Sequence, residues 1–426
     1  MVCEKNCKNV EKMQEDLSSK LSNVCGRCKS VDACFFSKSE AFCSQCFMTY
    51  FTRKFHKTMD VFLKSRDFPQ KNKVLIAIST GASLALVKLL SQEQHTFIFK
   101  TYFSTFSFIH IEEDNLVESE PSPSYIHQKI NEVFPESLFF SINLKNYILS
   151  SVDNIKLFFD KASNTVLGSQ VSGESIRSID DILSPLLSST SRADILRQLR
   201  NNIIYDFSEK NGYNVIIWGD TATSIASKVI SETAKGRGYS IPWETHGKIK
   251  YANDIWLLRP MKDLTKHEVY FFLQSNGIKS EIKKVDHKIT TIDELVNQYI
   301  DNLEKSNPNF IFTIYRTASK LQIPKIENTK NESSNFCFIC KMPKENNIKD
   351  WIEKITINKV NDNKINDNDV NDNYRKYNNR TEDICYGCFV MLKGAKEHLV
   401  FPCIRTENIH QIRNSKDEVL SKYLIE

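Results

Sequence analysis

The residues with the clearest capacity for chemistry are cysteines, which occur in pairs at a spacing suited to metal binding. The chain has twelve cysteines in 426 residues, and eight of them make four Cys-x-x-Cys pairs: Cys25 and Cys28, Cys43 and Cys46, Cys337 and Cys340, and Cys385 and Cys388. Each pair can chelate from one tight turn, and two pairs complete a tetrahedral thiolate site. We therefore predict two structural zinc centres, one near each end of the sequence.

Four cysteines lie outside these pairs. Cys34 is predicted to be a buried thiol rather than a ligand, and Cys403 is an alternative ligand for the second centre. Cys3 and Cys7 are either additional ligands or free thiols. Because a four-thiolate zinc site leaves no coordination position for a substrate, we expect both centres to support folding rather than catalysis.

A second candidate for chemistry is a turn of small residues between an expected strand and an expected helix. Residues 74–78 are apolar and rich in β-branched side chains, and Ser79-Thr-Gly-Ala-Ser83 follows them. Leu84, Val87 and Leu90 then recur at helical spacing. In an open α/β sheet, phosphate binds at such a turn, on the free N–H groups of the next helix. Any α/β protein contains turns of this kind, so spacing alone leaves both interpretations open.

The elements that must position these residues alternate between strand and helix. Expected strands cover residues 74–78, 96–111, 138–144 and 214–218, and expected helices cover 84–90, 125–134, 176–206 with a break at Pro185, and 225–233. This alternation predicts an α/β fold with a doubly wound parallel sheet. The turns at 79–83 and 219–224 would then lie at the same edge of the sheet.

Basic residues indicate where a polyanion could bind. Residues 50–73 interleave aromatic and basic side chains and predict an amphipathic helix with a cationic face. The candidates for contact with nucleic acid are Arg53, Lys54, Lys57, Lys235, Arg237, Arg259 and Lys262. The alternatives are a solvated helix face for the first three, a plain glycine turn around Arg237, and a charged helix start after Arg259. The net charge of +5 does not decide between them.

Composition sets the broad class and the organisation of the chain. The hydrophobic content of 41% suffices for ordinary cores, and no apolar run approaches the roughly 20 residues that span a bilayer. The N-terminus has no apolar signal segment, so we expect no secretory route. We predict a cysteine-rich zinc module at 1–50, a basic helical linker at 51–72, an α/β domain at 73–325 and a second cysteine-rich module at 326–426. An Asn-rich five-residue repeat at about 358–380 is predicted to be disordered.

Together these motifs resemble the PP-loop ATPase superfamily and, within it, the cytoplasmic tRNA 2-thiolation protein 2 family. The resemblance rests on Ser-x-Gly-x-Ser after the first strand, Gly219-Asp220 after a later one, segments 234–243 and 259–269, and the flanking cysteine pairs. It covers about Val24 to Cys388 without the Asn-rich insert. It implies an adenine nucleotide hydrolase-like fold and a cytoplasmic location.

The resemblance also implies a function. Members of this family form a heterodimer with a catalytic PP-loop subunit and convert the wobble uridine of lysine, glutamate and glutamine tRNAs to 2-thiouridine. ATP adenylates the uridine C2 oxygen, and sulfur from a thiocarboxylated ubiquitin-like carrier displaces AMP. The same carrier is attached to other proteins in urmylation, but no residue of this sequence bears on that role.

The sequence departs from an active PP-loop, which carries Ser-Gly-Gly-x-Asp-Ser. Thr80 replaces the first glycine, Ser83 the aspartate and Leu84 the last serine. We therefore interpret the residues that remain as the remnant of a nucleotide loop. They are Ser79, Gly81, Ser83, Gly219 and Asp220. We assign no catalytic residue, and the lost carboxylate and hydroxyl argue against ATP as a cofactor of this subunit.

Residues 47–336 also contain no cysteine, whereas catalytic relatives hold sulfur or an iron–sulfur cluster on central cysteines. Three hypotheses follow. The favoured one is a non-catalytic subunit that binds tRNA and the catalytic partner. The others are an active ATP-dependent tRNA sulfurtransferase and a zinc-module adaptor without a tRNA role.

Overall fold

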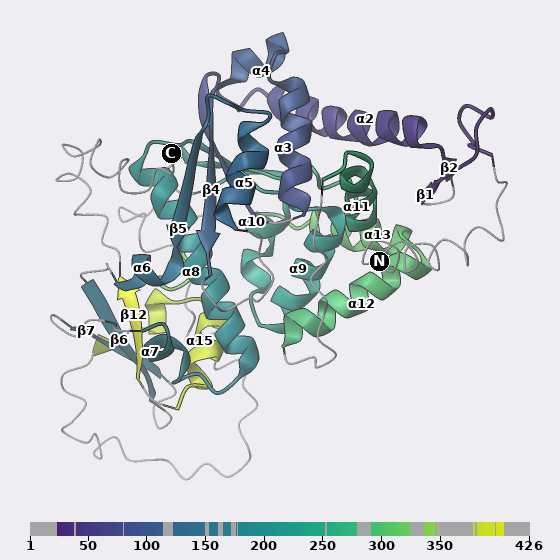
Figure 1. Cartoon of the computed structure of the whole chain (residues 1–426). Helices are drawn as coiled ribbons and strands as arrows, with labels where there is room; N and C mark the ends of the chain where they lie inside the picture. The colour runs from purple at the N-terminus through teal and green to yellow at the C-terminus, as the bar shows by residue number, and fades with distance from the viewer. Residues whose placement is uncertain are drawn as a thin grey trace, which may run out of the picture.

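The computed structural model is built around a six-stranded sheet, of which Figure 1 labels β4 and β5. The sheet has the strand order β5-β4-β3-β8-β10-β9. Its strands are β3 Asn72–Ile78, β4 Phe103–Glu112, β5 Leu138–Asn143, β8 Val215–Ile217, β9 Lys248–Lys250 and β10 Trp256–Leu258. All neighbouring pairs are parallel except β9 with β10, which is antiparallel at the edge. The predicted doubly wound parallel sheet is confirmed, with one antiparallel edge strand added.

The structure describes most, but not all, of the chain. The described residues are 24–37, 40–79, 81–113, 122–149, 153–160, 165–171, 176, 178–251, 254–278, 291–323, 336–345, 348, 378–379, 381–396 and 398–403. Cys3, Cys7, Thr80 and the predicted boundary at 325/326 lie outside them.

The central strands are apolar because both faces of the sheet are covered. Alternate residues of β3 enter two different cores: Val74, Ile76 and Ile78 enter one, and Leu75 and Ala77 enter the other. Side chains of a strand point alternately to opposite faces, so a strand covered on both sides has an apolar residue at every position.

Helices cover both faces of this sheet. The first core is completed by α2 Ser44–Leu63, α3 Ala82–Glu93, α4 Phe97–Tyr102, α5 Pro123–Asn131 and α11 Lys266–Ser275. The second is completed by α6 Leu144–Leu149, α7 Asp180–Leu183, α8 Ser189–Lys210, α10 Ile241–Thr245 and α15 Tyr386–Lys393. A smaller cluster joins α9 Ala222–Ala234 to α12 Ile292–Ser306 and α13 Asn309–Ala318. The remaining helical turns are η1 Gly238–Ser240 and η5 Thr381–Asp383.

A second, antiparallel sheet was not predicted. Its order is β11-β7-β6-β12, formed by β11 Asn378–Asn379, β7 Thr165–Val171, β6 Asp153–Asp160 and β12 Leu399–Cys403. Strands from the middle of the chain and from its C-terminal part therefore share one sheet. Residues beyond 326 pack in the same core as β3. The last residues of the predicted Asn-rich insert, at 378–379, form a strand, and the rest of that insert lies outside the described residues.

Other sequence predictions differ in detail. The expected strand at 96–111 begins as α4, because the Thr96 hydroxyl accepts a hydrogen bond from the Phe99 backbone N–H and starts a helix before β4. The predicted break at Pro185 is confirmed, since it lies between α7 and α8. In the part of the chain that the structure describes, none of the helices has the length and apolar character needed to cross a bilayer.

Candidate metal centres and nucleotide loop

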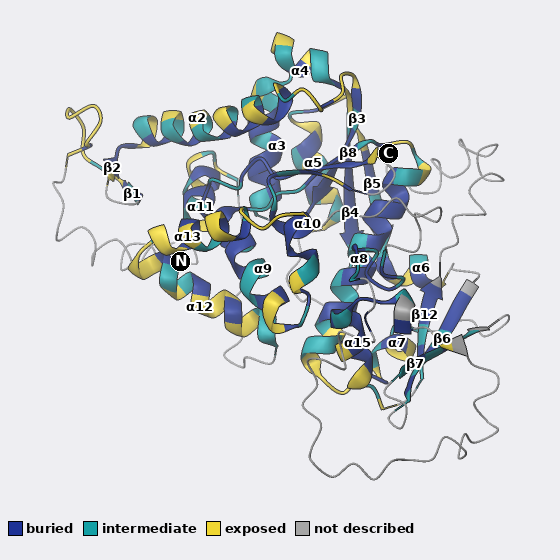
Figure 2. Cartoon of the chain, turned by 180° about the vertical axis from the view of Figure 1, so that it is seen from behind, coloured by how far each residue is buried: buried dark blue, intermediate teal, exposed yellow. Residues whose placement is uncertain are grey.

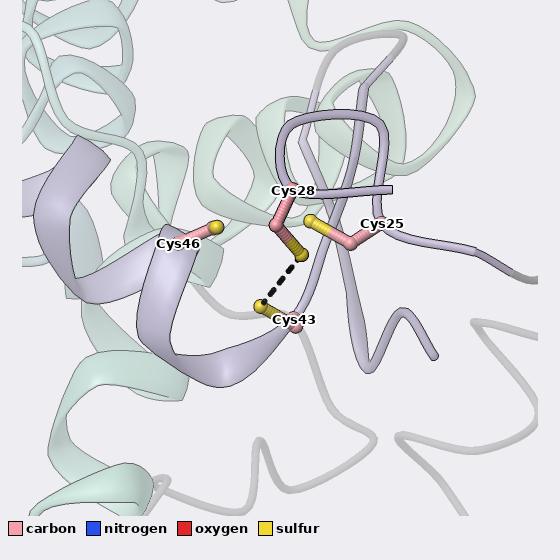
Figure 3. Close-up of side chains that lie close together, drawn as sticks. All are labelled: Cys25, Cys28, Cys43 and Cys46. Atoms are coloured by element: carbon pink, nitrogen blue, oxygen red, sulfur yellow. Dashed lines mark hydrogen bonds between the residues drawn. The ribbon is translucent and has the colours of Figure 1, made fainter. Parts of the chain in front are cut away.

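The N-terminal cysteines converge where a short hairpin meets a helix. The hairpin consists of β1 Phe35–Ser37 and β2 Glu40–Phe42, and Cys43 is the N-cap residue of α2. The four sulfur atoms of Cys25, Cys28, Cys43 and Cys46 lie within 4.8 Å of one another, with Cys28 Sγ 3.9 Å from Cys43 Sγ (Figure 3). Sulfurs at about 2.3 Å from a tetrahedral zinc are about 3.8 Å apart, so this group fits the metal.

The C-terminal cysteines follow the same local plan. Cys385 is the N-cap residue of α15, as Cys43 is for α2, and each helix carries its second cysteine in the first turn. In each centre the first cysteine pair is followed by a lysine with positive φ, Lys29 or Lys341. The backbone N–H of this lysine donates to the carbonyl of the first cysteine of the pair. Thiolates at a helix N-terminus are favoured by its free N–H groups and its dipole.

The C-terminal group also has metal-binding geometry. The sulfurs of Cys337, Cys340, Cys385 and Cys388 lie within 4.8 Å of one another, and Cys340 Sγ is 3.7 Å from Cys385 Sγ. Both predicted ligand sets are therefore assembled, and Cys403 is not needed to complete the second.

The two centres differ in exposure. All four C-terminal cysteines are buried, whereas Cys28 is exposed and Cys46 is partly exposed in the N-terminal group. Cys34 is exposed as well, so its prediction as a buried thiol is wrong. It lies directly before β1, where its backbone N–H donates to the Phe42 carbonyl and its side chain is exposed. The centres lie at opposite ends of the molecule, one beside α2 and the other beside α15 (Figure 1).

The N-terminal module is tied to the α/β body through one buried carboxylate. Glu268 of α11 accepts hydrogen bonds from Ser37 Oγ at 2.7 Å and Tyr50 OH at 3.0 Å, and it pairs with Lys54 Nζ at 3.0 Å. The Lys54 side chain is only 18% exposed. Because its charge is already paired with Glu268, the structure does not favour Lys54 as a tRNA contact.

Two further tRNA candidates are buried in a charged network next to the C-terminal cysteines. The Arg237 Nε atom lies 3.1 Å from Asp194 Oδ2. The Lys235 Nζ atom lies within 3.2 Å of carboxylate oxygens of Asp194, Glu232 and Asp293. Burial opposes ionisation of Asp194, but Arg237 and its neighbours hold the pKa of that carboxyl well below its usual value. The prediction that Lys235 and Arg237 contact tRNA is wrong for this reason.

Arg237 also reaches the metal ligands. Its Nη1 atom donates to Cys388 Sγ at 3.2 Å and to Cys385 Sγ at 3.5 Å. Sequence reasoning missed this contact, because the residues are about 150 positions apart and a Gly-Arg-Gly turn carries no sign of its partner.

In the turn that the sequence suggests as a nucleotide-loop remnant, Ser79 and Ser83 are bonded to each other. Gly81 caps α3 with φ +71° and ψ −106°, a backbone conformation that a side chain strains. The Ser79 backbone N–H donates to Ser83 Oγ at 2.9 Å, and the Ser83 hydroxyl donates to the Ser79 carbonyl. Leu84 is buried in the core. The side chain that replaces the aspartate thus bonds to the loop itself.

The predicted second turn lies against this loop. Strands β3 and β8 are parallel neighbours, so their carboxyl ends meet at one edge of the sheet. A Cβ atom on Gly219 would come within 3.0 Å of Ser83 Cα, so glycine is needed for this approach. The prediction that the turns at 79–83 and 219–224 share an edge is confirmed.

Asp220 in this second turn is neutralised by two cations. Lys228 Nζ lies 2.7 Å and Arg259 Nε 3.1 Å from its carboxylate. Burial opposes ionisation, yet these two charges lower the pKa of Asp220. Arg259 is itself buried and donates to the carbonyls of Trp243 and His246, so its prediction as a tRNA contact is wrong.

Of the remaining basic candidates, only Arg53 and Lys57 are fully exposed at the surface. Arg53 and Lys57 are exposed on the outer face of α2, while the opposite face packs into the core (Figure 2). They border a shallow depression of about 650 Å³ together with His56, Asp60, Val61 and Lys64. Lys262 is partly exposed, pairs with Asp263 at 3.2 Å and lies over the Tyr315 ring.

Comparison with known proteins gives consistent matches. Residues 291–390 match the family model described as cytoplasmic tRNA 2-thiolation protein 2. A relative of that name in Schizosaccharomyces pombe is 23% identical over 399 residues, covering 92% of this chain and 99% of the relative. One in Sclerotinia sclerotiorum is 30% identical over 309 residues, covering 68% of this chain and 80% of the relative.

A solved structure shares the fold. The U34-tRNA thiolase NcsA from Methanococcus maripaludis, described with its [4Fe-4S] cluster, superposes with a TM-score of 0.51 at 16% identity, covering 72% of this chain and 93% of that one. At this identity the likeness supports the fold alone. On the extent of the sequence matches, the chain belongs to the cytoplasmic tRNA 2-thiolation protein 2 family.

Proposed function

We propose that this chain is a non-catalytic subunit of a cytoplasmic complex that 2-thiolates the wobble uridine of tRNA. Family membership supports the role in tRNA 2-thiolation. The non-catalytic assignment rests on one observation. The Ser79 backbone N–H donates a hydrogen bond to Ser83 Oγ and is therefore not free to bind a phosphate. A phosphate-binding loop relies on N–H groups left free for the ligand.

The state of Asp220 supports the same assignment. A carboxylate that organises Mg²⁺ and phosphate must offer its negative charge to the ligand. Here Lys228 and Arg259 both form ion pairs with Asp220, so its negative charge is already neutralised within the protein. Chemistry then falls to a catalytic PP-loop partner in a heterodimer, supplied with sulfur by a thiocarboxylated ubiquitin-like carrier. The two cysteine groups would hold structural zinc.

For tRNA binding we propose the outer face of α2. Arg53 and Lys57 are four residues apart and therefore share one helix face. Lys64, the C-cap residue of α2, lies two turns further along but pairs with Asp60 at 2.8 Å. These side chains are exposed, in contrast to the buried Lys235, Arg237 and Arg259. Exposed arginine and lysine side chains on one helix can neutralise successive phosphates.

Fluorescence anisotropy with a labelled target tRNA tests this role. The purified pair of subunits should bind more tightly than the catalytic subunit alone. The double variant Arg53→Ala and Lys57→Ala in this chain should weaken binding and lower the slope of log Kd against log salt by about 2, because two phosphate contacts are lost. The matched control removes two exposed lysines elsewhere, Lys145→Ala on α6 and Lys393→Ala on α15.

The control should leave both affinity and salt slope unchanged. If the pair binds no better than the catalytic subunit alone, the tRNA-binding role is rejected. If both double variants weaken binding equally, contact is spread over the surface and the assignment to α2 is wrong.

A further inference from the structure

Two glycine-containing turns that are far apart in sequence fit into each other at the C-terminal cysteine group. One is Lys235-Gly-Arg-Gly238, which links α9 to η1, and the other is Cys385-Tyr-Gly-Cys388 at the start of α15. A Cβ atom on Gly387 would lie 2.3 Å from Arg237 Cγ. A Cβ atom on Gly236 would lie 2.9 Å from the Tyr386 ring, and φ at Gly236 is +79°.

Each turn thus uses a glycine to make room for a side chain of the other. Gly387 admits Arg237, and Gly236 admits Tyr386. By contrast, a Cβ atom on Gly238 would meet nothing within 4 Å, so this second glycine of the same turn is not required by the contact. The fit is therefore specific to two positions rather than a general feature of glycine-rich turns.

Charge explains why an arginine occupies this position. Four thiolates around a divalent metal carry a net charge of about −2, and a buried charge of that size is costly without compensation. The Arg237 side chain is 1% exposed and donates from Nη1 to the sulfurs of Cys385 and Cys388. Asp194 holds the other edge of the guanidinium through Nε and Nη2, which fixes its orientation.

We infer that the Lys235-Gly-Arg-Gly238 turn forms the outer shell of the C-terminal metal centre, with Arg237 as the residue that positions and charge-compensates two of its thiolate ligands. This centre is then the one that retains its metal, and the exposed N-terminal centre is the one that loses it first. A guanidinium hydrogen-bonded to a thiolate withdraws electron density from sulfur and blocks the approach of electrophiles. Outer-shell partners of this kind typically affect metal affinity by about 10- to 100-fold when removed. The inference does not depend on tRNA thiolation.

The test uses the purified full chain loaded with zinc. N-ethylmaleimide is added, zinc release is followed with a chromogenic indicator, and mass spectrometry maps which cysteines have been alkylated at each time. We expect Cys28 and Cys46 to react first, with one equivalent of zinc released, and Cys385 and Cys388 to react at least about tenfold more slowly.

Replacement of the arginine should remove this difference. In Arg237→Met, alkylation of Cys385 and Cys388 should accelerate by about 10- to 100-fold, while Cys28 and Cys46 react at their original rate. Those N-terminal cysteines are an internal control in the same molecule. Arg237→Lys, which keeps the charge but not the forked geometry, should have an intermediate effect.

A matched pair of glycine variants keeps the inference testable if Arg237→Met does not fold. Gly387→Ala displaces Arg237 without deleting it and should speed zinc loss from the C-terminal centre, whereas Gly238→Ala should not. Equal rates for Gly387→Ala and Gly238→Ala would overturn the inference. So would an unchanged C-terminal rate in Arg237→Met, equal reactivity of both centres in the unmodified chain, or a chain that binds fewer than two zinc ions.

Discussion

Ser83 Oγ accepts a hydrogen bond of 2.9 Å from the backbone N–H of Ser79, across the turn that would hold a phosphate in an active PP-loop. The Ser83 side chain is buried and also donates to the Ser79 carbonyl. The Ser83 side chain therefore links the two ends of the turn. This contact is the local basis of our proposal that the chain is non-catalytic.

Removing that link should weaken the fold without producing nucleotide binding. In Ser83→Ala the Ser79 N–H loses its buried partner, so we expect the free energy of unfolding to fall by about 1–2 kcal/mol. Urea denaturation followed by circular dichroism measures the change, and calorimetric titration with ATP should detect no binding in either protein. Tight ATP binding by Ser83→Ala would mean that the hydroxyl alone had blocked an otherwise intact site.

The backbone at Gly81 should tolerate no side chain, although there is room for one. Its φ of +71° is strained for alanine, while a Cβ atom there would meet nothing within 4 Å. Gly81→Ala is expected to destabilise the protein by about 1–3 kcal/mol. Gly238→Ala also places its Cβ in open space, but at a backbone conformation without positive φ, and should change the urea midpoint little. Equal effects of the two substitutions would contradict this explanation.

Asp220 should stabilise the fold at neutral pH and lose that effect in acid. Its pKa is lowered in the folded state, because Lys228 and Arg259 outweigh the cost of burial. Its contribution is therefore full above the unfolded pKa of about 3.9 and is lost as pH falls through the folded pKa. Asp220→Asn leaves two cations unpaired and should cost about 3–5 kcal/mol at pH 7.

The difference in urea midpoint between the unmodified chain and Asp220→Asn should thus be large at pH 7 and begin to shrink below about pH 4. Asp254→Asn is the control, because Asp254 pairs with Lys250 at the surface and is 85% exposed. It should have little effect at any pH. A difference for Asp220→Asn that stays constant down to pH 3 would show that charge is not the cause.

Lys54 and Arg53 are sequence neighbours with opposite expected roles. Lys54→Ala leaves the buried Glu268 without its cation and should lower the free energy of unfolding by about 3 kcal/mol, with tRNA affinity of the folded protein retained. Arg53→Ala should leave stability within about 0.5 kcal/mol and weaken tRNA binding. Thermal melts and anisotropy on both variants separate the two effects. A reversed pattern would exchange the assignments of the two residues.

The sequence was most informative where the signal is local. The apolar runs at 74–78 and 214–218 predicted two buried strands, because a strand covered on both faces is apolar throughout. The structure shows that these strands are neighbours. The Cys-x-x-Cys pairs predicted both ligand groups, since chelation from one turn fixes the spacing. The buried face of β6 is formed by every second residue, Ile155, Leu157 and Phe159. This two-residue period is typical of a strand and could have predicted β6, but it was missed.

The sequence was least informative about which charged side chains are buried in the folded protein. Arg237 and Arg259 look like surface residues in a basic segment, but their carboxylate partners Asp194 and Asp220 come from other elements. Burial of a charge depends on a partner brought close by the fold, and such pairs leave no local pattern. The same holds for β12, whose partner β6 is more than 200 residues earlier in the chain.

The central claim is that this chain is required for thiolation but does not perform the chemistry. The most direct measurement is 2-thiouridine formed on a purified target tRNA, with ATP and the sulfur donor supplied, by this chain alone, by the catalytic partner alone and by both together. We predict product only when both are present, and the same yield when this chain carries Ser79→Ala. Product from this chain alone would contradict the account, because it would mean that the turn at 79–83 still activates ATP.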